Sequence, residues 1–186
     1  MKLILRDFET ASPDVDEKKI TENMQNEGKS PEEIACALAA AKAEAAFVAA
    51  GSPADTVVIG ADTSVVTGSQ ILGKPEGRED AVRMLTELSG ITHRVITGVC
   101  LFGENGIRQW AEVSLVEFYQ ADDFQTALIE RYCDSDEPYD KAGAYGIQGG
   151  GALLVKRMEG DYFNVVGLPV GALARELEKY TGERSF

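Results

Sequence analysis

Apolar and polar positions along the chain follow two periods, one typical of helices and one typical of strands. The segment SPEE at 30–33 offers an N-cap, a proline at the first helical position and a glutamate at N3, and the Ala-rich run that follows stops at Gly51. Helices are therefore predicted over 34–50, 80–88, 122–132 and 169–180, and strands over 1–5, 56–60, 92–102, 108–118 and 152–158. The turn ENG at 104–106 joins the two longest strands as a hairpin. Helices and strands alternate without a linker or repeat, which favours an α/β fold in one domain.

Charged residues fall at a strand end or in glycine-containing loops at three places, GADT at 60–63, ILGKP at 71–75 and DKAGAYGIQG at 140–149. Such positions leave side chains free of the core and let the backbone approach a ligand. Asp62 is either a turn residue whose carboxylate binds the next backbone N–H groups, or a general base or Mg²⁺ ligand. Lys74 and Lys141 are either solvated loop charges or cations for an anionic ligand. The local pattern leaves both alternatives open at each position.

The composition narrows the classes of partner. Lys and Arg number 18 against 31 Asp and Glu, so the net charge of the 186 residues is −13. This balance argues against a nucleic acid or an anionic membrane as partner. Cys36, Cys100 and Cys133 are odd in number and form no CxxC pair, which argues against a zinc knot or a disulfide framework. Because no apolar run approaches the roughly 20 residues that span a bilayer, we expect a soluble, cytoplasmic protein.

Other polar features give weaker predictions. His93 is the only histidine and lies in a predicted strand, so a structural or surface role is favoured over Ser-His-Asp or Cys-His catalysis. The glycines at 149–151 are not followed by Lys-Ser/Thr, so they are not a Walker loop, and steric freedom at a strand start is the expected reason for them. The acidic run DVDE at 14–17 is either a solvated charge run or a divalent-cation site.

Eight motifs, in order along the chain, together resemble one known family. They are DVDE at 14–17, AKA at 41–43, GADT at 60–63, ILGKP at 71–75, AVRMLTELSG at 81–90, THRVITGV at 92–99, DKAGAYGIQ at 140–148 and GDYFNVVGLP at 160–169. From about Phe8 to Tyr180 the chain resembles the Maf family of nucleotide pyrophosphatases. The resemblance implies an α/β fold related to inosine triphosphate pyrophosphatases, with an elongated mixed sheet flanked by helices, two lobes around a nucleotide cleft, and often a homodimer. It also implies hydrolysis of a nucleoside triphosphate to the monophosphate and pyrophosphate with Mg²⁺ or Mn²⁺.

The family motifs assign roles to particular residues. Attack of water at the α-phosphorus builds charge on phosphate oxygens, so the reaction needs positioned cations more than covalent chemistry. By the match, Asp62 is the proton acceptor for the attacking water, and Glu17 binds the metal together with Asp62, with Asp16 a weaker candidate. Lys42 and Lys74 are the expected catalytic cations, and Lys141 is expected to bind the substrate.

The forms ADT at 61–63 and YGIQ at 145–148 resemble the family branch that prefers dTTP and UTP. Uracil and thymine present acceptor, donor and acceptor along one edge, which a glutamine amide matches with one donor and one acceptor. Gln148 and Thr63 are therefore predicted to select the base, although Gln148 could instead be a loop amide bound to its own backbone. The alternative functions are a nucleotide-binding or partner-binding protein without turnover, in keeping with the septum-formation role attached to the family, and a general phosphatase.

The family pattern departs from this chain at one point. Maf-like chains run from a strand like residues 1–5 into a Ser-x-Ser-Pro-Arg-Arg loop and a helix, whereas here Leu5 is joined directly to Arg6. Such a loop is a natural cradle for a triphosphate. Burial of the apolar side chains of that helix would stabilise the fold by roughly 6 to 12 kcal/mol, which is comparable with the whole stability of a domain. We therefore favour a segment left out of this sequence over a protein made without it, in which turnover would be weak or absent.

Overall fold

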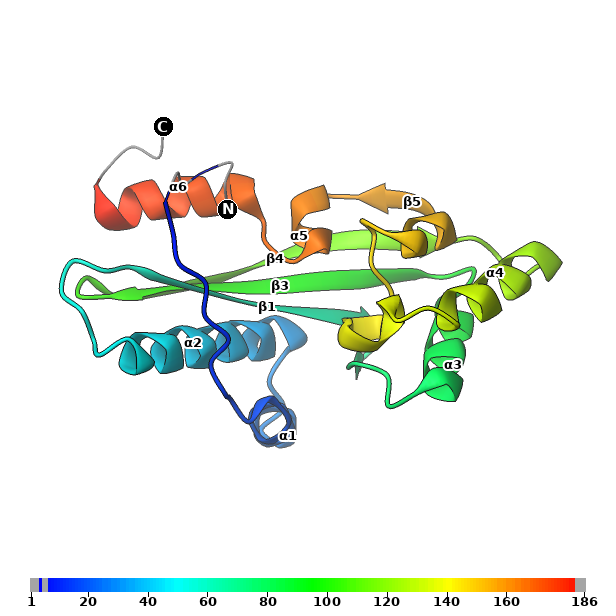
Figure 1. Ribbon diagram of the computed structural model, residues 1–186, viewed down its shortest axis with the longest axis horizontal. Helices are drawn as coiled ribbons and strands as arrows, with labels where there is room; N and C mark the ends of the chain where they lie inside the picture. The colour runs from blue at the N-terminus through cyan, green and yellow to red at the C-terminus, as the bar shows by residue number, and fades with distance from the viewer. Residues whose placement is uncertain (1–3, 5–6, 183–186) are drawn as a thin grey trace. The chain divides into compact units, whose positions relative to one another are not determined.

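The computed structural model describes residue 4 and residues 7–182, and it confirms the expected α/β fold (Figure 1). The α-helices are α1 Glu17–Asn26, α2 Pro31–Ala49, α3 Arg78–Leu88, α4 Asp123–Cys133, α5 Tyr162–Val166 and α6 Val170–Thr181. The strands are β1 Val58–Thr67, β2 Gln70–Leu72, β3 Thr92–Gly103, β4 Gly106–Phe118 and β5 Val155–Glu159. Three short 3-10 helices are η1 Glu137–Asp140, η2 Ala142–Ala144 and η3 Gly150–Leu154.

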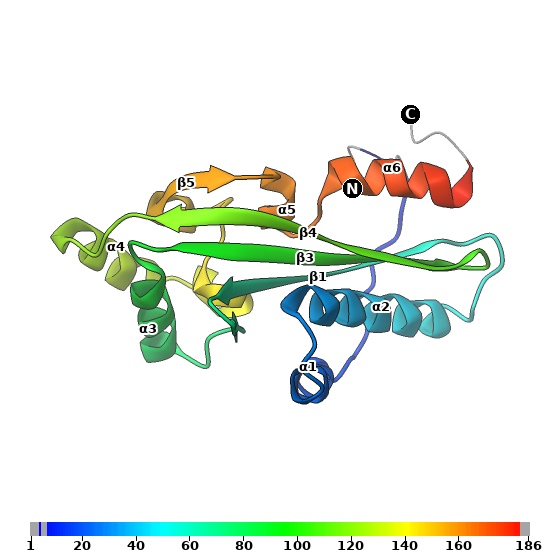
Figure 2. The same cartoon turned by 180° about the vertical axis from the view of Figure 1, so that it is seen from behind.

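The strands pair in the order β2-β1-β3-β4-β5 (Figure 1). Strands β1 and β2 are antiparallel with Val65 opposite Leu72, and β4 and β5 are antiparallel with Leu115 opposite Glu159. Strand β3 ends at Gly103 and β4 begins at Gly106, so the predicted hairpin is confirmed. Figure 2 shows the same arrangement from behind.

The predicted elements are found with shifted ends. Helix α2 has the expected start, since the Ser30 hydroxyl accepts from the Glu33 N–H while the Glu33 carboxylate accepts from the Ser30 N–H. The strand predicted over 56–60 is wrong in extent, because β1 continues to Thr67 through its pairing with β2. Strand β5 is shorter than predicted because residues 152–154 belong to η3. Helices α1 and α5 were not predicted.

The described residues fall into two compact units. Unit 1 takes the chain up to Asp62, then Thr97–Glu112, and the part from Gly167 onward; unit 2 takes Thr63–Ile96 and Val113–Val166. In unit 1 the sheet lies between α2 and α6 (Figures 1 and 2). Because strand side chains alternate, residues 58, 60 and 62 of β1 share the side that faces α2, and residue 59 faces α6. Val58 packs beside Ala39 and Ala43 of α2, whereas Ile59 packs with the apolar cluster that includes Leu173 of α6.

Two glycines let α2 approach the sheet closely. A Cβ atom at Gly60 would lie 2.1 Å from the carbonyl oxygen of Ala39, and one at Gly98 would lie 2.2 Å from the carbonyl oxygen of Ala35. Both obstacles are backbone atoms, which cannot rotate away. The alanines and glycines therefore fix the distance between α2 and the sheet, and with it the reach of every side chain on that face of α2.

Unit 2 buries one face of its part of the sheet. Strand β4 alternates there, with Ser114, Val116 and Phe118 buried and Val113 and Leu115 exposed. The buried side chains from the strands pack with α3, α4 and the loop before β5, and the cluster contains Val65, Leu72, Leu85, Leu88, Val95, Val116, Phe118, Leu128, Ile129, Tyr132, Tyr145 and Leu154.

The strand predicted over 1–5 lies, apart from Ile4, outside the described residues, and so does the junction of Leu5 with Arg6. Ile4 itself is in a turn and is buried in the apolar cluster of unit 1. The three cysteines are free thiols, as predicted. Among the helices of the described residues, none is both long enough and apolar enough to cross a membrane.

Candidate active site

Three of the predicted site residues meet in unit 1. The Lys42 Nζ donates to Oδ1 of Asp62 at 2.7 Å and lies 2.9 Å from Oε1 of Glu17. The side chain of Asp62 is only 10% exposed, and those of Lys42 and Glu17 are 24% and 45% exposed. We call Glu17, Lys42 and Asp62 the Lys42 cluster. The turn alternative for Asp62 is wrong, because the residue lies in the middle of β1 and its carboxylate accepts from an ammonium group.

Local structure explains how the three side chains converge. Asp62 shares the α2-facing side of β1 with Gly60, where the helix comes closest to the sheet. Lys42 precedes Ala43, one of the alanines at that close approach, so its side chain reaches the neighbouring carboxylate. Glu17 is the first residue of α1, which packs on α2, and the helix begins there because the Asp16 carboxylate accepts from the Lys19 N–H. Asp16 is thus occupied as an N-cap.

The electrostatics of the cluster keep Lys42 charged. Burial alone would lower the pKa of Lys42, but the hydrogen bonds and charges of Asp62 and Glu17 outweigh it and leave the pKa above its ordinary value. Lys42 is therefore an ammonium group at neutral pH and cannot serve as a general base. Two carboxylates around one ammonium leave the cluster with one net negative charge, which suits a cation better than a phosphate.

Glu17 and Asp62 also fit a divalent metal of a particular kind. Carboxylate oxygens are the ligands that Mg²⁺ and Mn²⁺ prefer, and both carboxylates approach the same point. Within the described ranges, no group of three or more His, Cys, Asp or Glu side chains could hold a metal ion. Mg²⁺ commonly uses one or two carboxylates together with waters and substrate phosphates. The donor set fits that mode and does not fit a cage made by the protein alone.

The other two predicted lysines lie on adjoining loops of unit 2. The Gly143 N–H donates to the carbonyl oxygen of Gly73 at 3.0 Å, which joins the loop of Lys74 to that of Lys141. We call residues 73–75 and 140–144 the lysine loops. Lys141 Nζ donates to Oδ1 of Asp140 at 2.6 Å, and this bond, with a smaller contribution from the charge of Lys74, lowers the pKa of Asp140. Two lysines and one carboxylate leave one net positive charge, which suits a phosphate.

The second lysine loop contains strained backbone. Gly143 has φ of 66°, and a Cβ atom there would lie 2.9 Å from the side chain of Val65. Ala144 is buried with φ of 62°, a conformation that costs a residue other than glycine about 1 to 3 kcal/mol. The surrounding contacts therefore impose one shape on this loop.

The predicted base-selecting residues also belong to unit 2. Thr63 shares one face of β1 with Val65, against which Gly143 packs, and this face is opposite to that of Asp62. Gln148 lies in an exposed turn. Its amide forms no hydrogen bond with the part of the chain that the structure describes, so the alternative of an amide bound to its own backbone is not what the structure has.

His93 is structural, as the sequence favours. It is buried in β3, where Nε2 lies 2.9 Å from the Tyr145 hydroxyl and the ring packs edge to face against Phe118. Burial lowers the pKa of His93 to about 4, so the ring is neutral at physiological pH. The contact fastens Tyr145, three residues before Gln148, to the sheet.

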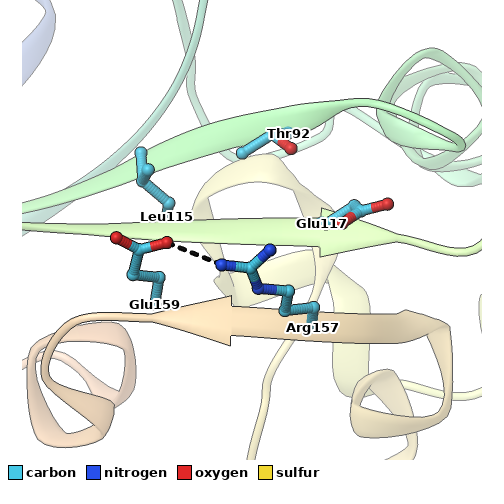
Figure 3. A pocket seen from close by; sticks show the side chains of 5 residues that line it. All are labelled: Thr92, Leu115, Glu117, Arg157 and Glu159. Atoms are coloured by element: carbon cyan, nitrogen blue, oxygen red, sulfur yellow. Dashed lines mark hydrogen bonds and ion pairs between the residues drawn. The ribbon is translucent and has the colours of Figure 1, made fainter.

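A hollow of about 160 Å³ lies on the less buried face of the sheet in unit 2 (Figure 3). It is lined by Thr92, Leu115, Glu117, Arg157 and Glu159. Arg157 and Glu159, both on β5, form an ion pair at 2.8 Å, which is drawn as a dashed line in Figure 3. Pockets for small molecules usually measure about 300 to 1,000 Å³. The hollow is too small for a nucleotide, and none of the predicted site residues lines it.

Sequence reasoning missed Glu137 and Tyr132, which bind the glycine-rich turn around Gln148. The Glu137 carboxylate accepts from the Tyr132 hydroxyl and from the Gly150 N–H, each at 3.0 Å. A Cβ atom at Gly149 would lie 2.1 Å from Oε1 of Glu137. The predicted steric reason for the glycines is therefore confirmed, whereas the strand start is wrong, because residues 150–154 form η3. Three consecutive glycines were the available signal.

Comparison with known proteins gives consistent matches over most of the chain. A family model described as Maf-like protein matches residues 1–180. The dTTP/UTP pyrophosphatase of Pyrococcus furiosus is 46% identical over 164 residues, which are 88% of this chain and 80% of that protein. The dTTP/UTP pyrophosphatase of Geobacillus sp. is 49% identical over 154 residues, 83% of this chain and 80% of its own. That of Carboxydothermus hydrogenoformans is 45% identical over 184 residues, 97% of this chain and 91% of its own.

Proposed function

The chain belongs to the Maf family, and from this premise we propose that it hydrolyses dTTP and UTP to the nucleoside monophosphate and pyrophosphate. The observation that carries the proposal is the identity of 45 to 49% to relatives named for this activity. The convergence of Glu17 and Asp62 on Lys42 supports it, because phosphoryl chemistry needs a base and cations held in fixed positions.

Asp62 is the proposed general base. It is the most buried carboxylate of the Lys42 cluster, and β1 and the ammonium of Lys42 fix its position. A base must lie within hydrogen-bond reach of the proton that it removes, and a fixed carboxylate meets that condition better than a mobile one. Lys42 stays protonated and is proposed to hold the two carboxylates together and to offset negative charge that develops at the α-phosphate.

Glu17 and Asp62 are the proposed ligands of Mg²⁺ or Mn²⁺. The bound metal would neutralise charge on the phosphates and make the attacking water more acidic. The net negative charge of the Lys42 cluster favours a cation there, and Glu17, at the start of a surface helix, is exposed enough to change rotamer when one binds.

Lys74 and Lys141 are the proposed phosphate ligands, and Gln148 and Thr63 the proposed ligands of the base. The lysine loops carry a net positive charge, and Lys74 is exposed. The Gln148 amide is exposed and forms no hydrogen bond within the described residues, so it can offer one donor and one acceptor to the acceptor, donor and acceptor edge of uracil or thymine. A homodimer remains a prediction from the family.

The test is to incubate the purified protein with dTTP or UTP and Mg²⁺ or Mn²⁺ and to identify the products. We expect pyrophosphate and the nucleoside monophosphate in equal amounts. Nucleotide binding without release of pyrophosphate would reject the enzyme in favour of a binding protein. Orthophosphate as the first product would indicate a general phosphatase instead.

A further inference from the structure

A hydrogen-bond network in unit 2 fastens the turn that carries Gln148. The two oxygens of the Glu137 carboxylate are used separately, since Oε1 accepts from the Tyr132 hydroxyl and Oε2 accepts from the Gly150 N–H. The Tyr132 hydroxyl oxygen accepts in turn from the Gly146 N–H at 3.1 Å. The residue at each end of the segment Gly146–Gly150 is therefore bound to the same pair of side chains.

The residues around this network are closely packed. A Cβ atom at Gly149 would lie 2.1 Å from Oε1 of Glu137, and one at Gly151 would lie 2.7 Å from the carbonyl oxygen of Gly146. Tyr132 is buried at the end of α4, and its pKa is raised by burial, with further contributions from Glu137. The backbone of the turn thus rests directly on the carboxylate and the phenol.

The partners of Glu137 are neutral. No ion pair of its carboxylate occurs in the described ranges, and its donors are a phenol and a backbone amide. A half-buried carboxylate with only neutral donors adds little as a charge but serves well as a double acceptor, because a hydrogen bond to an ionised acceptor is stronger than one between neutral groups. Glu137 therefore acts on the shape of the turn.

We propose that Glu137, with Tyr132, is a positioning residue that orients Gln148 toward the pyrimidine base. The inference rests on the proposed function. Glu137 binds the turn on both sides of Gln148 and does not itself contact the nucleotide. Loss of the carboxylate frees the turn, so that the amide of Gln148 samples many orientations and the base is bound less tightly and less selectively.

The variants Glu137→Ala and Glu137→Gln separate positioning from charge. Glutamine keeps the shape and accepts from the Gly150 N–H, but its NH2 group then faces the Tyr132 hydroxyl, whose proton loses its acceptor. The glutamine variant should therefore raise KM by only about two- to threefold, less than the alanine variant. Alanine should raise KM for UTP about tenfold, as for one lost charge-assisted hydrogen bond, with kcat changed less than about threefold. The preference for UTP over CTP should fall by a similar factor. Glu130→Ala, a neighbouring exposed glutamate paired with Arg78, is the matched control and should change neither.

Three measurements decide the proposal. Unchanged KM and selectivity in Glu137→Ala, or equal losses in the alanine and glutamine variants, would overturn it. Amide hydrogen exchange over 146–151 gives a readout that needs no activity: exchange must rise in Glu137→Ala, and unchanged protection also overturns the inference. If the alanine variant does not fold, Tyr132→Phe, which removes a single hydroxyl, takes its place with the same expectations. Failure of the parent enzyme to release pyrophosphate rejects the proposed function, whatever the exchange data show.

Discussion

The Lys42 cluster and the lysine loops carry opposite net charges and are held in place by different means. In the Lys42 cluster two carboxylates share one partly buried ammonium, and ion pairs between α1, α2 and β1 fix it. In the lysine loops Lys141 pairs with the exposed carboxylate of Asp140, on which the charge of Lys74 also acts, and a backbone hydrogen bond joins the two loops. The first arrangement suits a metal and a base, and the second suits phosphates.

The ion pairs of the Lys42 cluster and of the lysine loops should contribute differently to stability. The Asp62 carboxylate is only 10% exposed, so its removal takes the better-buried partner from Lys42 and should cost more than the loss of an exposed pair. The exposed pair of Lys141 with Asp140 is screened by water and salt and is worth little. Removing one carboxylate from each place should therefore give very different results.

The largest effect is expected for Asp62→Asn. The amide keeps the size of the side chain but cannot take a proton, and the loss of a general base usually costs about 10² to 10⁴ in rate. We expect kcat for dTTP to fall by that factor while dTTP binding, measured by calorimetry, changes only a fewfold. Asp134→Asn is the matched control, because that carboxylate is exposed and pairs with Arg78 and with no residue of the cluster in the described part of the chain. Equal turnover in Asp62→Asn and the parent enzyme would remove Asp62 from the mechanism.

The second-largest effect is a dependence of stability on pH, and it comes from His93 in unit 2. The His93 ring contacts the Tyr145 hydroxyl, and burial lowers the pKa of His93 to about 4 in the folded protein against 6.5 ordinarily. The unfolded chain therefore binds more protons between these values, so His93 stabilises the protein fully above pH 6.5 and progressively less as pH falls toward 4. The loss amounts to roughly 3 kcal/mol.

Denaturant unfolding of the parent protein and of His93→Gln at pH 7 and pH 4 measures this contribution. Other carboxylates also titrate in that range, so the comparison is between the two proteins at each pH. We expect the free energy of unfolding of His93→Gln to fall less than that of the parent protein. Parallel changes in the two proteins would show that the pKa of His93 is the same in the folded and unfolded states.

The sequence predicted the parts of the fold that depend on local chemistry. The capping box at Ser30 and the turn at 104–106 need only neighbouring residues, and both are where they were expected. Helix α1 was missed because none of its ten residues is fully buried and only Ile20 and Met24 give it an apolar side; packing on α2 and the Asp16 cap form it. Asp62 was placed at a strand end because the extension of β1 depends on a partner strand further along the chain.

For the candidate site, too, local features could be predicted from the sequence and contacts between distant residues could not. The residue types and their loops could be predicted, since Asp62, Lys74 and Lys141 stand in recognisable motifs. Which of them touch could not, because the contact of Lys42 with Asp62 depends on how closely α2 lies on β1. Glu137 gave no signal of its own, since its function is to accept from groups that only the folded loop brings near.

The third-largest effect tests how closely α2 lies on β1. Gly60→Ala places a Cβ atom 2.1 Å from the backbone of Ala39, so α2 must move away from β1. Overpacking of this kind typically costs about 1 to 3 kcal/mol, and the Lys42 contact with Asp62 should lengthen as well. We expect a lower melting temperature together with lower kcat. Gly171→Ala in α6 is the matched control, because only the end of a flexible arginine lies near it, at 3.6 Å, and its stability should be equal or higher.

The smallest effect has the opposite sign. Asp140 offsets part of the positive charge of the lysine loops, and its side chain is 78% exposed. Asp140→Asn should therefore lower KM for UTP by about twofold at low salt, with kcat unchanged, and the gain should vanish as salt screens the loops. Lys141→Met should raise KM instead, by about tenfold if it binds a phosphate oxygen through a charge-assisted hydrogen bond. A large loss of turnover in Asp140→Asn would break the comparison, because the carboxylate would then take part in the reaction as Asp62 is proposed to do.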